Sequence, residues 1–248
     1  MIMEKFQWLC VFEQILISHG SAIFMGYLIT FEGVEGSGKT TQIRRLEEFL
    51  KTTGWQCTVT REPGGSSVGN QIRRILLSSD TIELTPLGEL FLYEAARAQH
   101  VAEVIQPAVR KGMIVLCDRF CDATLAYQGH GRELDLTMVE DLNRLASQGL
   151  TPDLTLLLDC PAEIGLRRAS QRISAKKPAL REDRFERESL AFHQRVREGY
   201  LQIARGDPDR VRVIDASVEE SEIHRTVCDI VEARLREVMG REASPIGT

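Results

Sequence analysis

The segment from residue 33 to residue 40 has the residue types and spacing of a phosphate-binding loop. It reads Gly-Val-Glu-Gly-Ser-Gly-Lys-Thr, follows an apolar run at 27–31 and precedes a helix-like pattern at 41–51. Glycines let backbone N–H groups turn toward phosphate oxygens, and the N-terminus of the following helix adds a positive dipole. Lys39 is expected to reach the β and γ phosphates, and the Thr40 hydroxyl to bind Mg²⁺. The predicted nucleotide-binding residues are Gly33, Val34, Glu35, Gly36, Ser37, Gly38, Lys39, Thr40 and Thr41.

A charged pair closes another apolar run. Asp118 and Arg119 follow the apolar residues 113–117. An aspartate there can hold a water of the Mg²⁺ shell or contact the phosphate-binding lysine, and the arginine can bind a second phosphate. A strand-end salt bridge is the alternative, and Asp159, which closes a further apolar run, competes for the same role. Because a cation follows it directly, Asp118 is the predicted metal-shell residue.

Absent motifs narrow the class of nucleotide-binding protein. A GTPase would carry Asn-Lys-x-Asp for guanine and Asp-x-x-Gly for its switch, and neither string occurs in the chain. A motor-type ATPase usually ends its metal-binding strand with Asp-Glu, whereas Arg119 follows Asp118 here. A kinase of a small molecule remains.

The segment 164–187 is densely basic and is interrupted at 174–178. A solvated helix face is the usual explanation for such a run. In a phosphotransferase, a lid that closes over the substrates and brings arginines onto the transferred phosphoryl group is the favoured interpretation. The lid is predicted at about 167–187. Its basic residues are Arg167, Arg168, Arg172, Lys176, Lys177, Arg181, Arg184 and Arg187.

Composition and charge exclude some partners. The chain has 248 residues, 43% of them hydrophobic, and a formal net charge of −5, which suits one α/β domain and gives no basic field for nucleic acid. Six scattered cysteines without metal-type spacing favour a reduced, cytoplasmic protein. Residues 1–24 are predicted to be an extension outside the fold, with a signal peptide as the alternative, and their apolar run is too short to span a membrane.

Short apolar runs alternate with helical patterns, which is typical of a parallel sheet covered by helices. Strands are expected at 28–32, 56–60, 113–118, 154–159 and 211–215. Helices are expected at 40–52, 67–78, 85–111, 136–148, 161–173, 184–204 and 218–239, with Pro107 ending or kinking the third. Residues 25–240 would form one domain, and 241–248 a disordered tail. Ligands of such sheets bind beyond the carboxyl ends of the strands, where the glycine loop, residues 61–65 and the Asp118 pair would converge.

From residue 25 to about 239 the chain resembles the bacterial thymidylate kinases. The strings that carry the resemblance are Phe-Glu-Gly-Val-Glu-Gly-Ser-Gly-Lys-Thr-Thr, Thr-Arg-Glu-Pro-Gly-Gly, Ala-Arg-Ala-Gln-His, Asp-Arg-Phe, Ala-Tyr-Gln-Gly, Asp-Arg-Phe-Glu and Ile-Asp-Ala, in family order. The resemblance implies a three-layer P-loop NTPase fold with a five-stranded parallel sheet and a basic lid. It also implies Mg²⁺-dependent transfer of the γ-phosphate of ATP to dTMP, and a homodimer.

The resemblance assigns roles to individual residues. Tyr93 stacks on thymine, and Arg97, one helical turn away, donates to the base edge; an ordinary core aromatic and a surface arginine paired with Glu94 or Glu103 are the alternatives. Glu35 contacts the sugar hydroxyl. The implied substrate-binding residues are Glu35, Arg61, Glu62, Arg73, Tyr93, Arg97, Arg119, Thr124, Tyr127 and Gln128. Because the P-loop carries no arginine, a lid arginine completes the implied catalytic set of Lys39, Asp118, Arg119 and Arg172.

Two other functions stay open at this stage. A kinase of a hydroxyl acceptor, such as a deoxynucleoside, would need a general base, for which Glu62 is the candidate. A nucleotide-binding regulatory module without turnover is the other, although the intact Lys39, Thr40, Asp118 and Arg119 disfavour it.

Overall fold

The computed structural model describes residues 26–78, 84–174 and 183–242. Within them lies one parallel sheet with the strand order β2-β3-β1-β4-β5. The strands are β1 (Tyr27–Glu32), β2 (Cys57–Arg61), β3 (Ile114–Asp118), β4 (Leu154–Asp159) and β5 (Val211–Asp215). Strands β1, β3 and β4 are buried almost throughout, which explains their continuous apolar character. The predicted five-stranded parallel sheet is confirmed.

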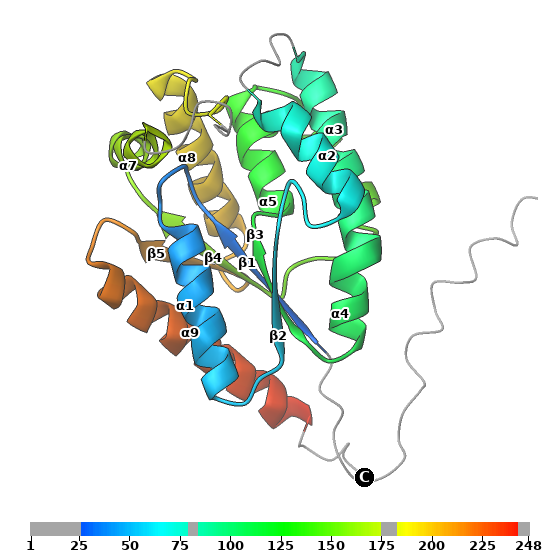
Figure 1. The fold of residues 1–248 in the computed structure, drawn as a ribbon, viewed down its shortest axis with the longest axis vertical. Helices are drawn as coiled ribbons and strands as arrows, with labels where there is room; N and C mark the ends of the chain where they lie inside the picture. Colours follow the sequence, from blue (N-terminus) through cyan, green and yellow to red (C-terminus); the bar gives the residue numbers. More distant parts are fainter. Residues whose placement is uncertain (1–25, 79–83, 175–182, 243–248) are drawn as a thin grey trace, which may run out of the picture.

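Helices cover both faces of the sheet. Figure 1 shows α1 and α9 on one side and α4, α5 and α8 on the other. The helices are α1 (Lys39–Thr52), α2 (Ser67–Leu77), α3 (Pro86–His100), η1 (Val101–Ile105), α4 (Gln106–Arg110), α5 (Cys121–Thr124), η2 (Leu125–Gly131), α6 (Leu136–Ala146), α7 (Ala162–Ser174), α8 (Leu190–Gly206) and α9 (Glu220–Glu242). No helix in these described stretches is both long and apolar enough to cross a bilayer.

The strand register brings the predicted site segments to one edge. Asp118, the last residue of β3, pairs with Phe31 of β1 on one side and with Arg61 of β2 on the other. The loops that follow these three strands therefore leave the sheet at the same level. This places the glycine loop, Arg61 and Asp118 beside one another, as the rule for open parallel sheets predicts.

The structure corrects the start of one predicted helix and shows how another passes Pro107. The predicted helix 184–204 begins later, at Leu190, because the Ser189 hydroxyl accepts from the backbone N–H of Phe192 and caps the helix there. The predicted helix 85–111 is confirmed as the continuous run of α3, η1 and α4, and of the two effects expected of Pro107, an end of the helix is wrong. The helix continues to Arg110 after the π-helical stretch η1, in which the widened turn lets Gln106 donate to the carbonyl of Val101.

Several predictions fall on residues outside the described stretches. These are the extension 1–24, the lid residues 175–182, which include Lys176, Lys177 and Arg181, and most of the tail 241–248. Of the tail, Arg241 and Glu242 belong to α9.

Candidate active site

The P-loop folds around its own lysine. The ammonium of Lys39 donates to the carbonyl oxygens of Gly33 and Val34, both at 2.9 Å, and to the hydroxyl of Ser37 at 3.3 Å. Burial and the positive charge of Arg119 lower the pKa of Lys39 to about 8, against the opposing effect of nearby carboxylates. The lysine therefore sits where a phosphate anion would restore its full charge.

Two glycines allow the loop to approach its neighbours. A Cβ on Gly33, where φ is +133°, would lie 2.4 Å from the carbonyl oxygen of Leu158. A Cβ on Gly36 would lie 2.1 Å from the carbonyl oxygen of Gly165 on α7. Gly38, with φ of +99°, directly precedes α1. The loop thus packs backbone against backbone, and its shape excludes side chains at these positions.

Most of the predicted site residues line one cavity of about 860 Å³ at the carboxyl edge of the sheet. Gly33 and Val34 do not line it: the Gly33 carbonyl turns to Lys39, and the Val34 side chain packs in the core. Arg172 lies in α7, but its side chain is outside the described part. The predicted residues that line the cavity are Glu35, Gly36, Ser37, Gly38, Lys39, Thr40, Thr41, Arg61, Glu62, Arg73, Tyr93, Arg97, Asp118, Arg119, Thr124, Tyr127 and Gln128.

The two residues predicted for the metal are adjacent. The Thr40 hydroxyl donates to Oδ2 of Asp118 at 3.2 Å. The competing Asp159 forms a bidentate ion pair with Arg197, at 2.7 and 2.8 Å, and is not among the cavity-lining residues. The geometry favours Asp118 over Asp159, since only Asp118 is beside the P-loop hydroxyl.

Arg119 is held in an unusual backbone conformation by four partners. Its φ is +72°, in the left-handed region that a residue with a side chain seldom adopts. One terminal nitrogen donates to the Gly33 carbonyl and the Tyr200 hydroxyl, and the other to Glu35 and the Tyr127 hydroxyl, all within 3.1 Å. The contacts fix the guanidinium between the P-loop and η2.

The pKa values of two carboxyl groups near Arg119 are shifted in opposite directions. Burial would raise the pKa of Glu35, but the charge of Arg119 and the hydrogen bonds to His193 and Tyr127 outweigh it and lower the pKa to about 2. Burial raises the pKa of Glu32 to about 8, and the charge of Asp122 adds to this effect. At neutral pH Glu35 is therefore an anion and Glu32 is mostly neutral.

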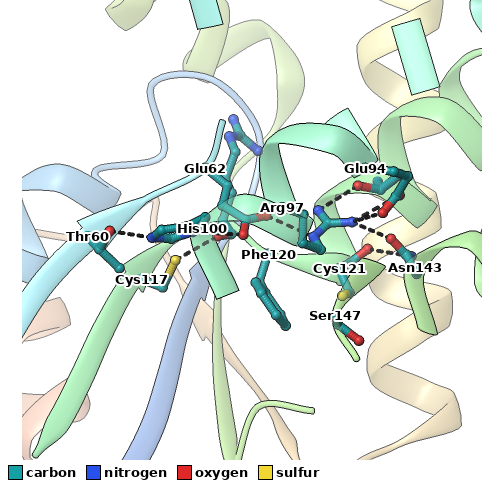
Figure 2. A network of polar contacts seen from close by, with 12 residues as sticks. Thr60, Glu62, Glu94, Arg97, His100, Cys117, Phe120, Cys121, Asn143 and Ser147 are labelled. Carbon is teal, nitrogen blue, oxygen red and sulfur yellow. Dashed lines mark hydrogen bonds and ion pairs between the residues drawn. The ribbon is translucent and has the colours of Figure 1, made fainter. Parts of the chain in front are cut away.

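Arg97 lies in a buried polar network (Figure 2). Its Nε donates to Glu62 at 2.9 Å, and its Nη1 donates to both oxygens of Glu94 at 3.0 Å and to Asn143 at 2.5 Å. Its Nη2 donates to the hydroxyl of Thr124 at 2.8 Å. The Arg97 side chain is only 1% exposed, so the alternative of a surface arginine is wrong, although the pairing with Glu94 is present.

Tyr93 and Gln128 complete the polar and aromatic lining on this side. The Tyr93 ring is half-buried in the cavity wall, with its centroid 6.5 Å from that of Phe185. The side-chain amide of Gln128 donates to Glu89 at 2.8 Å. Both residues line the cavity and are of the types that base recognition would use.

The chain is similar in sequence and in structure to known proteins. The thymidylate kinase family model matches residues 31–227 of this chain. The chain belongs to the thymidylate kinase family. It is 56% identical over 212 residues to the thymidylate kinase of Citrifermentans bemidjiense, covering 86% of this chain and 94% of the relative. It is 60% identical over 193 residues to that of Geobacter sp. strain M21, covering 78% and 85%. The crystal structure of thymidylate kinase from Ehrlichia chaffeensis superposes with a TM-score of 0.66 at 32% identity, covering 83% of this chain and 98% of that one.

For this family member, the arginines predicted for the lid divide into two kinds. Arg184 is anchored by the carbonyl of Leu76 and by Glu89, at 2.5 and 2.6 Å, and Arg187 pairs with Asp183. Arg168 on α7 donates to a backbone carbonyl at 3.0 Å and lines the cavity. Among the lid arginines whose side chains are described, Arg168 is the one that faces the substrate space.

Some cavity residues were missed from the sequence. Phe120, Phe185 and Glu186 line the cavity, although only the strings Asp-Arg-Phe and Asp-Arg-Phe-Glu indicated their neighbourhood. Val218, which precedes α9, and Ile223, in the first turn of α9, also line it, beyond Ile-Asp-Ala. That string was the available signal, because it ends strand β5 at the same edge as the P-loop.

Proposed function

We propose that the protein transfers the γ-phosphate of ATP to the phosphate of dTMP, giving dTDP and ADP, as a step of dTTP synthesis. The observation that carries the proposal is a single cavity that joins the P-loop lysine, Arg119 and the Tyr93–Arg97 wall. Membership of the thymidylate kinase family supports the same substrates.

Phosphoryl transfer between two phosphates depends mainly on how the two substrates are positioned. An oxygen of the acceptor phosphate attacks the γ-phosphorus, and the bond to the β–γ bridging oxygen breaks as ADP leaves. A phosphate acceptor is already anionic, so no base is needed, and catalysis rests on alignment and on neutralising charge. Lys39 and Arg119 supply that charge. Both oxygens of Glu62 already accept hydrogen bonds, from Arg97 and His100, which disfavours the alternative in which Glu62 deprotonates a hydroxyl acceptor.

The residues present suit a magnesium ion. Thr40 and Asp118 offer hard oxygen ligands 3.2 Å apart at the mouth of the P-loop. We assign Thr40 as the direct ligand, with Asp118 holding the water shell. When bound, Mg²⁺ would neutralise the β and γ phosphate oxygens.

ADP release in a coupled assay tests the activity. The acceptors are dTMP, dUMP, dCMP and thymidine at equal concentration, each with ATP and Mg²⁺. We expect the highest kcat/KM for dTMP and none above background for thymidine. Turnover of thymidine, with a kcat that falls at acidic pH, would instead favour a nucleoside kinase that uses Glu62 as its base.

A homodimer and a cytoplasmic location belong to the same proposal. Neighbouring helices α2 and α3 expose large apolar side chains, with Val68 and Ile75 on α2 and Leu87 and Phe91 on α3, the last at 53% exposure. Such a surface suits a second copy of this chain. Light scattering should give twice the chain mass, and Phe91→Glu should give monomers; a monomeric wild type would contradict the dimer. The described cysteines are all free, which suits a reducing compartment.

A further inference from the structure

Arg97 has one donor left for a ligand. A guanidinium carries five N–H bonds. The Nε hydrogen goes to Glu62, the two on Nη1 go to Glu94 and Asn143, and one on Nη2 goes to Thr124. Within the described residues the second Nη2 hydrogen has no partner, and Arg97 lines the cavity. The network therefore leaves a single donor whose direction depends on how firmly the other four are held.

His100 holds the carboxylate that holds Arg97. Its Nδ1 lies 2.9 Å from Oε1 of Glu62, while Oε2 of the same carboxylate accepts from Arg97. Its Nε2 lies 2.6 Å from the Thr60 hydroxyl. A carboxylate can only accept, so Nδ1 carries a proton and donates to Glu62, while Nε2 forms the second hydrogen bond of the ring with the Thr60 hydroxyl. The ring is fully buried, and Figure 2 shows it between Thr60 and Glu62.

The connectivity of Glu62, His100 and Thr60 is that of a nucleophilic triad, but its location excludes that use. His100 and Thr60 are not among the cavity-lining residues. A Cβ on Gly65 would lie 2.3 Å from the His100 ring, so backbone closes that side. The Thr60 hydroxyl therefore does not face the substrate cavity, and the arrangement is placed to orient Glu62 rather than to attack a substrate.

We propose that His100 is a positioning residue for acceptor-base selection, acting through Glu62 on Arg97. It fixes Oε1 of Glu62, and Oε2 in turn fixes Nε of Arg97, so the remaining N–H of the guanidinium points to one place in the cavity. A donor there matches the O4 carbonyl of thymine and opposes the exocyclic amine of cytosine. The proposal rests on the function proposed above and on Arg97 reading the base.

The test compares kcat/KM for dTMP with kcat/KM for dCMP in wild type and two variants. His100→Leu removes the donor to Glu62, and His100→Asn restores an N–H near the position of Nδ1. We expect His100→Leu to lower the dTMP-to-dCMP ratio about tenfold, because a misdirected donor loses its hydrogen bond to the O4 carbonyl of thymine. We expect His100→Asn to recover most of that ratio. The ratio should fall through a higher KM for dTMP, with a smaller change in kcat.

A matched control separates positioning from stability. Thr155 is as buried as His100, and its hydroxyl bonds Thr30 and Asp122 in a network outside the cavity. Thr155→Val removes that hydroxyl. At a comparable loss of Tm, this variant should keep the wild-type ratio. If His100→Leu lowers kcat/KM for both acceptors equally, its role is structural and the proposal is overturned.

Two further outcomes remain decisive. If wild type accepts dCMP as well as dTMP, the role of Arg97 itself fails, which is a different failure from an unchanged ratio in His100→Leu. If His100→Leu does not fold, nitrogen NMR of the His100 ring in the wild-type protein decides. A proton on Nδ1 supports the proposal, and a proton on Nε2 alone overturns it, since Glu62 would then have no donor from the ring.

Discussion

Arg97, which is buried, and Arg119, which is half-buried, line the same cavity but are surrounded by different charged groups. Arg97 faces two carboxylates, Glu62 and Glu94, and its side chain is 1% exposed. Arg119 faces one ionised carboxylate, Glu35, and is 18% exposed. Each guanidinium also lies near an aromatic ring, Phe120 or Tyr127. The aromatic contacts are therefore alike, and the difference between the two sites lies in the charged groups around each arginine.

The two acidic side chains paired with Arg97 and the lysine beside Arg119 make the two sites suitable for different ligands. Arg97 is paired with two acidic side chains that offset its charge, so it offers a directed hydrogen bond and little field for an anion. Near Arg119, Lys39 adds a second cation opposite the carboxyl groups of Glu35 and Asp118, while the raised pKa of Glu32, about 8, keeps that carboxyl mostly neutral at pH 7. The first arrangement fits an uncharged base and the second fits phosphates.

The largest expected effect is on folding, at Arg97. Arg97→Met leaves Glu62 and Glu94 buried without their cation, which should cost about 3–5 kcal/mol of unfolding free energy. Urea denaturation measures it, and adding Glu94→Gln to the variant should recover part of the loss. If Arg97→Met is as stable as wild type, the two carboxylates do not depend on this arginine, and the contrast between the two sites fails.

Arg119→Met should instead act mainly on catalysis. It removes a charge that faces ligand, so kcat/KM for dTMP should fall about 100- to 1000-fold. Arg44→Met is the control, because Arg44 is an exposed arginine paired with Glu48 on α1. A loss of activity at Arg119 no greater than that at Arg44 would contradict the phosphate-binding role.

The affinity for ATP should depend on pH through Lys39. Its pKa of about 8 in the free protein means that the ammonium is charged below pH 8 and progressively neutral above it. Bound phosphate favours the charged form, so binding above pH 8 takes up a proton. The association constant should then be flat below pH 8 and fall about tenfold per pH unit above it. Titration calorimetry in buffers of different ionisation enthalpy detects the proton uptake.

Lys39→Arg provides the comparison for that titration. An arginine stays charged throughout this range, so above pH 8 its ATP affinity should fall only by the contribution of Glu32, whose pKa is also about 8, and less steeply than in wild type. Equal pH profiles in wild type and Lys39→Arg would show that Lys39 does not titrate above pH 8. Burial and the charge of Arg119 would then not lower the pKa of Lys39 as described above.

The sequence predicted the sheet and the P-loop, where phosphates would bind, better than it predicted the surroundings of Arg97, where the base would bind. The strands and the P-loop follow from local patterns, since apolar runs and glycines act through their immediate neighbours. The surroundings of Arg97 come from Glu62 and Asn143, which are 35 and 46 residues away in the chain. Helical spacing can place Tyr93 and Arg97 on one face, but it contains no information about which distant carboxylates reach that face.

Contacts between residues distant in the chain also explain why the helix predicted to begin at residue 184 begins later. Arg184 and Phe185 are compatible with a helix locally, yet the Arg184 guanidinium bonds to Glu89 and Phe185 is buried against Tyr127. These contacts keep both residues in a turn before the cap at Ser189. Tertiary contacts overrode a helical preference that was real but weak.

The smallest expected effect is at Tyr93, and it tests whether base recognition rests on a single donor. Within the described residues no hydrogen bond of the Tyr93 hydroxyl is found, and burial raises the pKa of Tyr93, so the phenol stays neutral. Tyr93→Phe should therefore change kcat/KM for dTMP by less than about twofold, while Tyr93→Ala should lose about 1–3 kcal/mol of acceptor affinity through lost stacking. Steady-state kinetics with dTMP and dCMP separate the two variants. If Tyr93→Phe lowered the dTMP-to-dCMP ratio, the hydroxyl would be a second polar reader of the base. Discrimination would then no longer depend on Arg97 alone, and neutralising Arg97 with two carboxylates would not explain how this side of the cavity selects its ligand.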